Sequence, residues 1–270
     1  MLRTPVLALL MVFAGFAQAE VPQTHRDLDW AAPLRWVHID NVAVDRFSVF
    51  ETARLRWKET LRRDGVLLGD GRPLFWCARG DSVRTYFTLY PFRKWVDLDE
   101  RSEMAKRTNG VVGEAAVKTY DAGDAALVPP HGSQLWRRQD AADIVCAATA
   151  ALTELSAGTG RLERRQVDWV HWDEFETTWA AVQAALAAQQ YPLACRVYAN
   201  SYGGAQGDWV LLWLATDDGA YRAAPALDDA LVKQLGPEQG ARLAQALTRL
   251  FPVNASYLID RRLDLSNLGE

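Results

Sequence analysis

Two histidines and a tyrosine on three predicted strands are the residues of this chain whose types could do chemistry. His38 lies in the stretch 34–42, which reads as a strand, and Tyr90 lies on a later strand of a predicted hairpin. His171 lies in the stretch 166–172, which we also interpret as a strand. A histidine on such a strand could act as a general base, although a hydrogen-bonded, partly buried histidine is the simpler interpretation. We take His38, Tyr90 and His171 as the candidate catalytic residues.

The aromatic residues suggest a ligand pocket. The chain has 11 tryptophans in 270 residues, and several lie on hairpin strands. An aromatic cavity with a few polar groups is typical of a small-molecule site, whereas the same rings could also pack a core solid. An arginine beside the first hairpin could hold a carboxylate through two hydrogen bonds. The candidate ligand-binding residues are Trp76, Tyr86, Arg93, Trp209 and Trp213.

No motif names a reaction. The chain has no G-x-S-x-G and no C-x-x-C, and the spacing of Cys77, Cys146 and Cys195 indicates no metal site. The glycine-rich stretch 200–207 leads into a strand, whereas a phosphate-binding loop leads into a helix. We therefore predict neither a metal nor a cofactor, and the sequence favours a non-catalytic binding protein over an enzyme.

Composition narrows the partners. The formal net charge is −4, and the basic residues form only short clusters. A nucleic-acid-binding face needs many clustered Lys and Arg side chains to displace counterions, so we predict no nucleic-acid partner. A small molecule remains the expected ligand.

The first 19 residues resemble an export signal. Arg3 precedes an apolar run over 5–16, and Ala17-Gln18-Ala19 forms an A-x-A cleavage site. The run is shorter than the roughly 20 residues of a spanning helix, although a retained anchor is the alternative. The expected mature protein is periplasmic or secreted, without stable membrane insertion after cleavage, and 20–33 form its N-terminal segment.

The rest of the chain repeats one pattern. The first copy, 34–139, has a helix that opens at Asp45, and the second copy, 161–270, has one that opens at Asp173. Apolar residues recur on one face of both helices, including Trp57 and Trp179, which we predict to be core residues. A helical connector, 140–160, joins the copies.

Each copy reads as β-α-β-β-α-β, the order of a ferredoxin-like unit. The expected strands are 34–42, 73–79, 84–92 and 133–138, then 166–172, 193–199, 208–215 and 254–262. Both sheets carry too many large apolar residues to leave one face in water. The fold class we predict is therefore α+β, with two ferredoxin-like repeats closing into an intramolecular, pseudo-dimeric barrel, which makes a monomer the expected state.

Three segments carry a family resemblance: Val42-Ala43-Val44-Asp45-Arg46-Phe47, Tyr86-Phe87-Thr88-Leu89-Tyr90-Pro91 and Trp95-Val96-Asp97-Leu98-Asp99. With them the chain resembles the dimeric α+β barrel superfamily in a tandemly fused form. The resemblance implies diverse activities, among them cofactor-free monooxygenases, haem enzymes and small-molecule decarboxylases, and also many members without a known one. The alternatives to a binding protein are therefore a small-molecule enzyme of this kind and a non-catalytic interaction protein of the cell envelope.

Overall fold

The computed structural model describes residues 30–63, 74–80, 82–205 and 207–266. The predicted signal sequence, 1–19, and most of the segment 20–33 lie outside the described residues. Among those that are described, no helix combines the length and the apolar character that a bilayer crossing requires.

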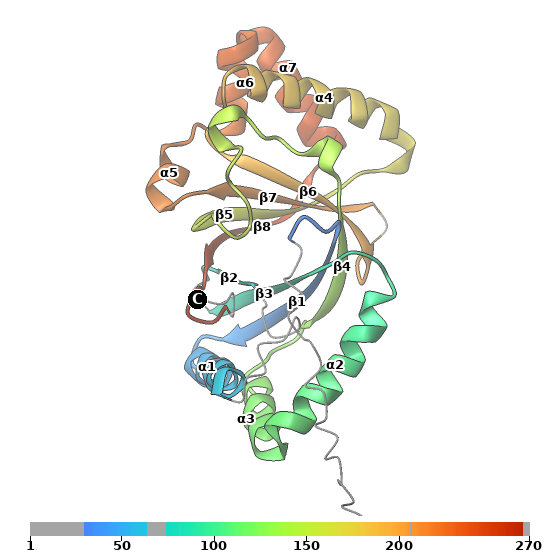
Figure 1. The fold of residues 1–270 in the computed structure, drawn as a ribbon. Coiled ribbons are helices and arrows are strands. Elements are labelled where there is room, and N and C mark those ends of the chain that lie inside the picture. The colour runs from blue at the N-terminus through green and yellow to red at the C-terminus, as the bar shows by residue number, and fades with distance from the viewer. Residues whose placement is uncertain (1–29, 64–73, 81, 206, 267–270) are drawn as a thin grey trace, which may run out of the picture.

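Eight antiparallel strands close into one barrel (Figure 1) in the order β1-β3-β2-β8-β5-β7-β6-β4. Each half contributes four neighbouring strands, and the halves join where β4 pairs with β6 and β2 with β8. The prediction of an α+β barrel is thus confirmed. The strands are β1 (Leu34–Ala43), β2 (Leu74–Ala78), β3 (Val83–Phe92), β4 (Gly132–Arg138), β5 (Thr159–Gln166), β6 (Ala194–Tyr202), β7 (Asp208–Ala215) and β8 (Val253–Arg261).

Helices cover the barrel from outside on two opposite sides (Figure 1). The first half carries α1 (Phe47–Arg63), α2 (Asp97–Val112) and α3 (Glu114–Asp124). The second half carries α4 (Trp172–Ala188), a short α5 (Asp218–Ala223), α6 (Leu227–Leu235) and α7 (Pro237–Leu250). The break between α2 and α3 falls at Gly113, whose φ of 81° suits glycine.

Side chains from all eight strands fill the barrel lumen. The largest are Trp76, Phe87, Trp136 and Tyr198, and each is almost completely buried. Of the two interpretations that the aromatic strands left open, the lumen follows the packed one. Burial of these side chains favours a filled lumen over the ligand-sized space that was the alternative.

The connector between the halves is not the helix that its alanines predict. It contains two short 3-10 turns, η2 (Asp140–Ala142) and η3 (Ala147–Thr149), and otherwise runs irregularly. Tertiary contacts override helix propensity here. Ile144 exchanges backbone hydrogen bonds with Cys195, and Leu152 and Ala157 join the lumen cluster. The connector therefore closes one end of the barrel.

A buried ion pair fixes the connector in that position. Arg35 is 0% exposed, and its Nη2 lies 3.1 Å from Glu154 Oε1. The Arg35 guanidinium also donates hydrogen bonds to two backbone carbonyls, from Nη2 to Trp30 and from Nη1 to Ala32. The Tyr198 hydroxyl donates to the same carboxylate oxygen. Burial alone would raise the pKa of Glu154, but Arg35 and Tyr198 outweigh it and hold the pKa below its ordinary value.

The strand predicted at 166–172 is wrong in position. β5 ends at Gln166, and Trp169–His171 form a 3-10 turn that Asp168 begins by accepting from the Val170 N–H. The sequence pattern did not predict β5 because the outward side chains of this strand are charged. Glu163 neutralises Arg161 at 2.9 Å and Arg165 at 2.7 Å, which lets the strand be buried.

All three cysteines have free, buried thiols. Cys77 and Cys195 lie on β2 and β6, the strands that follow α1 and α4. Burial raises the pKa of each thiol, Cys146 included. They pack as small apolar side chains.

Candidate functional site

Two of the candidate catalytic residues meet on the outer face of the first half-barrel. Neighbouring positions Arg35 and Val37 are buried, whereas Trp36 and His38 belong to the outward face of β1. β1 pairs with β3 so that Trp36 lies opposite Tyr90. The His38 ring lies 5.1 Å from the Trp36 ring and 6.1 Å, edge to face, from the Tyr90 ring. The structure therefore places an imidazole between two aromatic walls.

Ser133 on β4 orients His38. The two residues face each other across the β1–β4 pair, and Ser133 Oγ lies 2.7 Å from His38 Nδ1. A hydrogen bond at one ring nitrogen fixes the ring orientation and couples its tautomer to the hydroxyl. The pair has the geometry in which a histidine can hold or move a proton.

Asp40 extends the polar row along β1. It is two residues beyond His38, so it faces the same side of the sheet. Burial raises the pKa of its carboxyl, Arg54 and His131 oppose this, and Asp124 adds to it. A carboxyl whose pKa is raised beside a histidine is a candidate acid or base.

α1 and α3 supply the opposite wall. Arg54 of α1 is buried, bonds to Asp124 Oδ1 at 2.7 Å and stacks 3.9 Å from the Tyr120 ring centre. Burial raises the pKa of the Tyr120 hydroxyl, and the nearby Tyr90 raises it further. The Tyr120 hydroxyl thus remains a neutral hydrogen-bond donor near Asp40. We name His38, Asp40, Tyr90, Tyr120 and Ser133 the outer-face cluster.

The other sequence candidates lie elsewhere. Trp76 is in the lumen, whereas Trp209 and Trp213 pack between the second sheet and its helices. Tyr86 lies under α1, where its hydroxyl donates to Glu51 at 2.5 Å. Arg93 is exposed after β3. Their ligand-binding roles stay predictions, but no shared pocket unites them in the part of the chain that the structure describes.

His171 is not on a strand. It ends the 3-10 turn before α4, is half exposed, and has Nδ1 3.8 Å from Glu174 Oε2. The reason is local: the turn that Asp168 starts takes residues 169–171 out of the sheet. His171 therefore belongs to the second half of the chain and lies on none of the strands β1, β3 and β4 that carry the outer-face cluster.

The sequence reasoning missed four members of this neighbourhood. Asp40 could have been found, because strand alternation alone puts it on the face of His38. Ser133 required the β1–β4 register, and Arg54 and Tyr120 required the packing of α1 and α3 on the sheet. No local motif marks them.

Asp40 provides a pH-dependent prediction. Since its folded pKa is raised, the stability that it contributes is present below the ordinary aspartate pKa of 3.8 and lost as the pH rises through the folded value. Asp40→Asn should therefore raise the melting temperature at neutral pH and lose this advantage in acid. Thermal denaturation across pH measures it, with the exposed Asp121→Asn as control. A variant that is less stable than the wild type at neutral pH would contradict the buried charge.

Comparison with solved structures identifies the fold. A candidate monooxygenase from Fusobacterium nucleatum superposes with a TM-score of 0.50 over 85% of this chain and 92% of its own, at 10% identity. The chain has an α+β fold with an eight-stranded antiparallel barrel, similar to that of dimeric α+β barrel proteins. A chlorite dismutase variant from Candidatus Nitrospira defluvii (TM-score 0.48, 10% identity, 87% and 94% coverage) and an anthrone oxidase-like protein (0.48, 12%, 85% and 91%) are also similar.

The similarity to the Fusobacterium protein shows the fold of the barrel and no more, because activity is not carried by fold at such low identity. No protein-family profile and no curated protein sequence matches the chain. What the barrel does must therefore be argued from its own outer-face cluster.

Proposed function

We propose that this barrel protein binds a small aromatic molecule at the outer-face cluster and that His38 exchanges a proton with it. The ligand would lie against the rings of Trp36 and Tyr90, outside the barrel and not in its lumen. This retains the expected small molecule but moves its site from the lumen to the outer face of the sheet.

One observation carries the proposal. His38 is held by Ser133 at 2.7 Å and flanked by two aromatic rings, while Asp40, with its raised pKa, follows on the same strand face. Aromatic walls supply apolar contact area, and the imidazole and carboxyl supply proton transfer. The second half has no histidine at its corresponding sheet surface, which is filled by a large aromatic and aliphatic cluster among the described residues.

The chemistry supported is acid–base work on an ionisable group of the ligand. His38 would accept a proton, and the hydroxyls of Tyr90 and Tyr120 would donate hydrogen bonds to the oxygen that becomes charged. This is the small-molecule enzyme alternative, and the name of the Fusobacterium protein with the same fold is consistent with it.

A thermal-shift screen of small phenols and aromatic acids tests the site. We expect some compounds to raise the melting temperature of the wild type, and the shift to disappear in His38→Ala. The matched control is His171→Ala, which changes a histidine outside the cluster. Compounds that stabilise the wild type and His38→Ala equally, or a complete absence of stabilising compounds, would contradict the proposal.

The remaining predictions concern the cellular location, the gene duplication and the oligomeric state of the protein. The signal-like residues 1–19 support export to the periplasm or beyond, and the recurrent element order of the two halves supports a duplicated gene. Because both half-barrels belong to one chain, we infer a monomer. Native mass spectrometry of the protein purified from periplasm, without reduction, tests cleavage before Glu20 and the monomeric state and would detect a co-purifying ligand.

A non-catalytic interaction protein is the second candidate. The observation in its favour is the turn before α4, where Val170 is 83% and Trp169 53% exposed, with Trp169 stacked on Trp172. Exposed apolar residues of this size mark contact sites in many proteins. A photo-crosslinking residue at position 170, compared with one at the exposed position 222, would capture a partner in the envelope if this role is correct.

A further inference from the structure

A groove runs along the outside of the first half between α1 and α3. Two adjoining cavities of about 390 and 520 Å³ form it, and both are lined by Arg56 and Thr119. The helices touch at Ala53 and Gly123, where a Cβ on the glycine would lie 2.7 Å from the alanine Cβ. The contact forms part of the groove floor, and cavities of this size accommodate small molecules.

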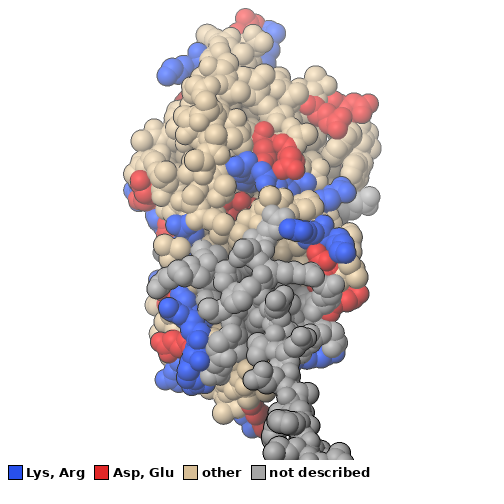
Figure 2. Space-filling view, in the orientation of Figure 1, with Lys and Arg blue, Asp and Glu red and all other residues tan. Residues whose placement is uncertain are grey.

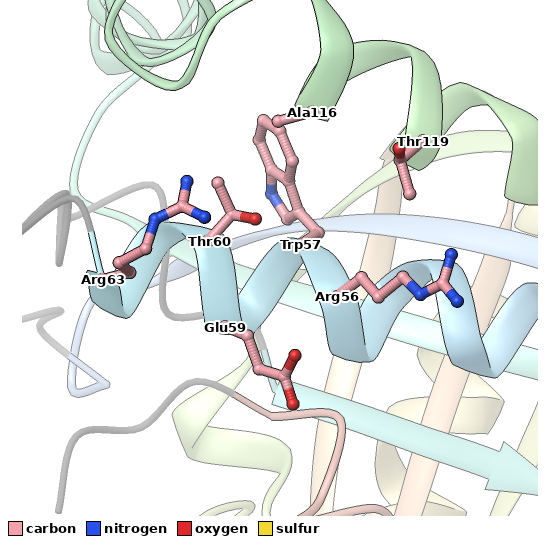
Figure 3. A pocket seen from close by; sticks show the side chains of 7 residues that line it. All are labelled: Arg56, Trp57, Glu59, Thr60, Arg63, Ala116 and Thr119. Atoms are coloured by element: carbon pink, nitrogen blue, oxygen red, sulfur yellow. The ribbon is translucent and has the colours of Figure 1, made fainter.

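Trp57 forms the apolar wall of the first cavity. Figure 3 shows its indole rising from α1 between the helices toward Ala116 on α3. The Trp57 indole is held in position by packing, because its ring lies 5.0 Å from the Tyr120 ring. A held indole with one exposed side is a platform on which a flat ring can stack.

The groove is positively charged in a chain whose net charge is −4. Arg56, Arg63 and Lys118 line it, and Glu59 is the carboxylate in the lining, but Figure 3 shows Glu59 directed to the opposite side of α1 from Ala116 and Thr119. Lys118 is paired with the exposed Glu114 at 2.8 Å. Arg56 forms no ion pair or hydrogen bond within the described part of the chain. Its guanidinium is thus available for an anion.

We propose that this groove is a second binding site, for a small flat aromatic anion such as an aryl carboxylate, which adjoins the outer-face cluster where Trp57 contacts Tyr120. The ring stacks on Trp57, and the carboxylate accepts hydrogen bonds from the Arg56 guanidinium. Arginine presents two parallel N–H groups, which match the two oxygens of a carboxylate. The Thr60 and Thr119 side chains border the same cavity.

The charge and the ring make separate demands on the ligand. A neutral ring of the same shape would keep the stacking but leave Arg56 unsatisfied, and a compact inorganic anion would keep the charge but lose Trp57. Much of the space-filling surface in Figure 2 is neither blue nor red. Salt should therefore weaken the binding of the carboxylate ligand more than the binding of its neutral amide analogue.

Calorimetric titration with 2-naphthoate and its neutral analogue 2-naphthamide tests the site. We expect saturable binding of naphthoate to the wild type, and binding roughly five- to tenfold weaker for naphthamide and for Arg56→Ala. Trp57→Phe should weaken both compounds. The control is Arg242→Ala, an exposed arginine on α7 of the other half, which should bind like the wild type.

Equal binding of naphthoate and naphthamide would overturn the proposal, and so would wild-type affinity in Arg56→Ala or no binding to the wild type. His38→Ala separates this site from the proposed function. If naphthoate binding is lost in His38→Ala and kept in Arg56→Ala, the molecule binds at the outer-face cluster and the groove is not a site. The opposite pattern supports the groove whether or not the proposed function holds.

Discussion

Glu154→Gln is expected to lower the free energy of unfolding by about 3–5 kcal/mol at neutral pH, the range for breaking a buried ion pair from one side. The glutamine keeps the shape of the side chain but leaves the Arg35 guanidinium, which is 0% exposed, without its counter-ion. It also removes the charged acceptor of the Tyr198 hydroxyl. Urea denaturation of the two proteins measures the difference.

The pH dependence of this loss follows from the lowered pKa of Glu154. A group whose folded pKa is depressed contributes stability above its unfolded pKa, ordinarily 4.5, and loses it as the pH falls through the folded value. The wild type and Glu154→Gln should therefore converge in acid. A difference that stays constant with pH would mean that packing, and not charge, accounts for the loss.

Two further variants isolate the charge. Arg35→Met combined with Glu154→Leu removes both partners, and it should be more stable than Glu154→Gln because no lone charge remains buried. Glu238→Gln removes one member of an exposed pair with Arg242 on α7 and should leave stability nearly unchanged. If Glu154→Gln, the double variant and Glu238→Gln lose the same free energy of unfolding, the buried ion pair does not hold the connector in place.

Trp179→Ala is expected to cost roughly 3–5 kcal/mol, as for other large aromatic truncations in cores. Trp179 packs against Phe175 and Phe251, and its Nε1 donates to the Ala142 carbonyl at 2.8 Å. The change therefore leaves a cavity in the second half and also an unpaired carbonyl at the start of the connector. Thermal or urea denaturation measures the loss.

Trp57→Ala is the matched comparison, because the sequence predicts the same core role for both tryptophans. The structure corrects this: Trp57 is half-buried and lines the groove between α1 and α3. Its truncation should cost clearly less than that of Trp179, since less apolar surface leaves contact. Equal costs would mean that the groove closes over Trp57 in solution.

The sequence by itself determined much of the architecture. Strand alternation was sufficient to predict β1, β3 and β7 to within one residue of their observed bounds, and amphipathic patterns were sufficient to predict α1 and α4. These features are local, because side-chain periodicity follows from backbone geometry. Closure of the barrel followed from the need to cover two apolar sheet faces.

Only the tertiary structure decided the rest. Strand pairing brought Ser133 to His38, helix packing brought Arg54 and Tyr120 to Asp40, and the Arg35–Glu154 pair drew an alanine-rich connector out of helical form. Each of these depends on contacts between residues far apart in the chain, and local propensity contains no information about such contacts.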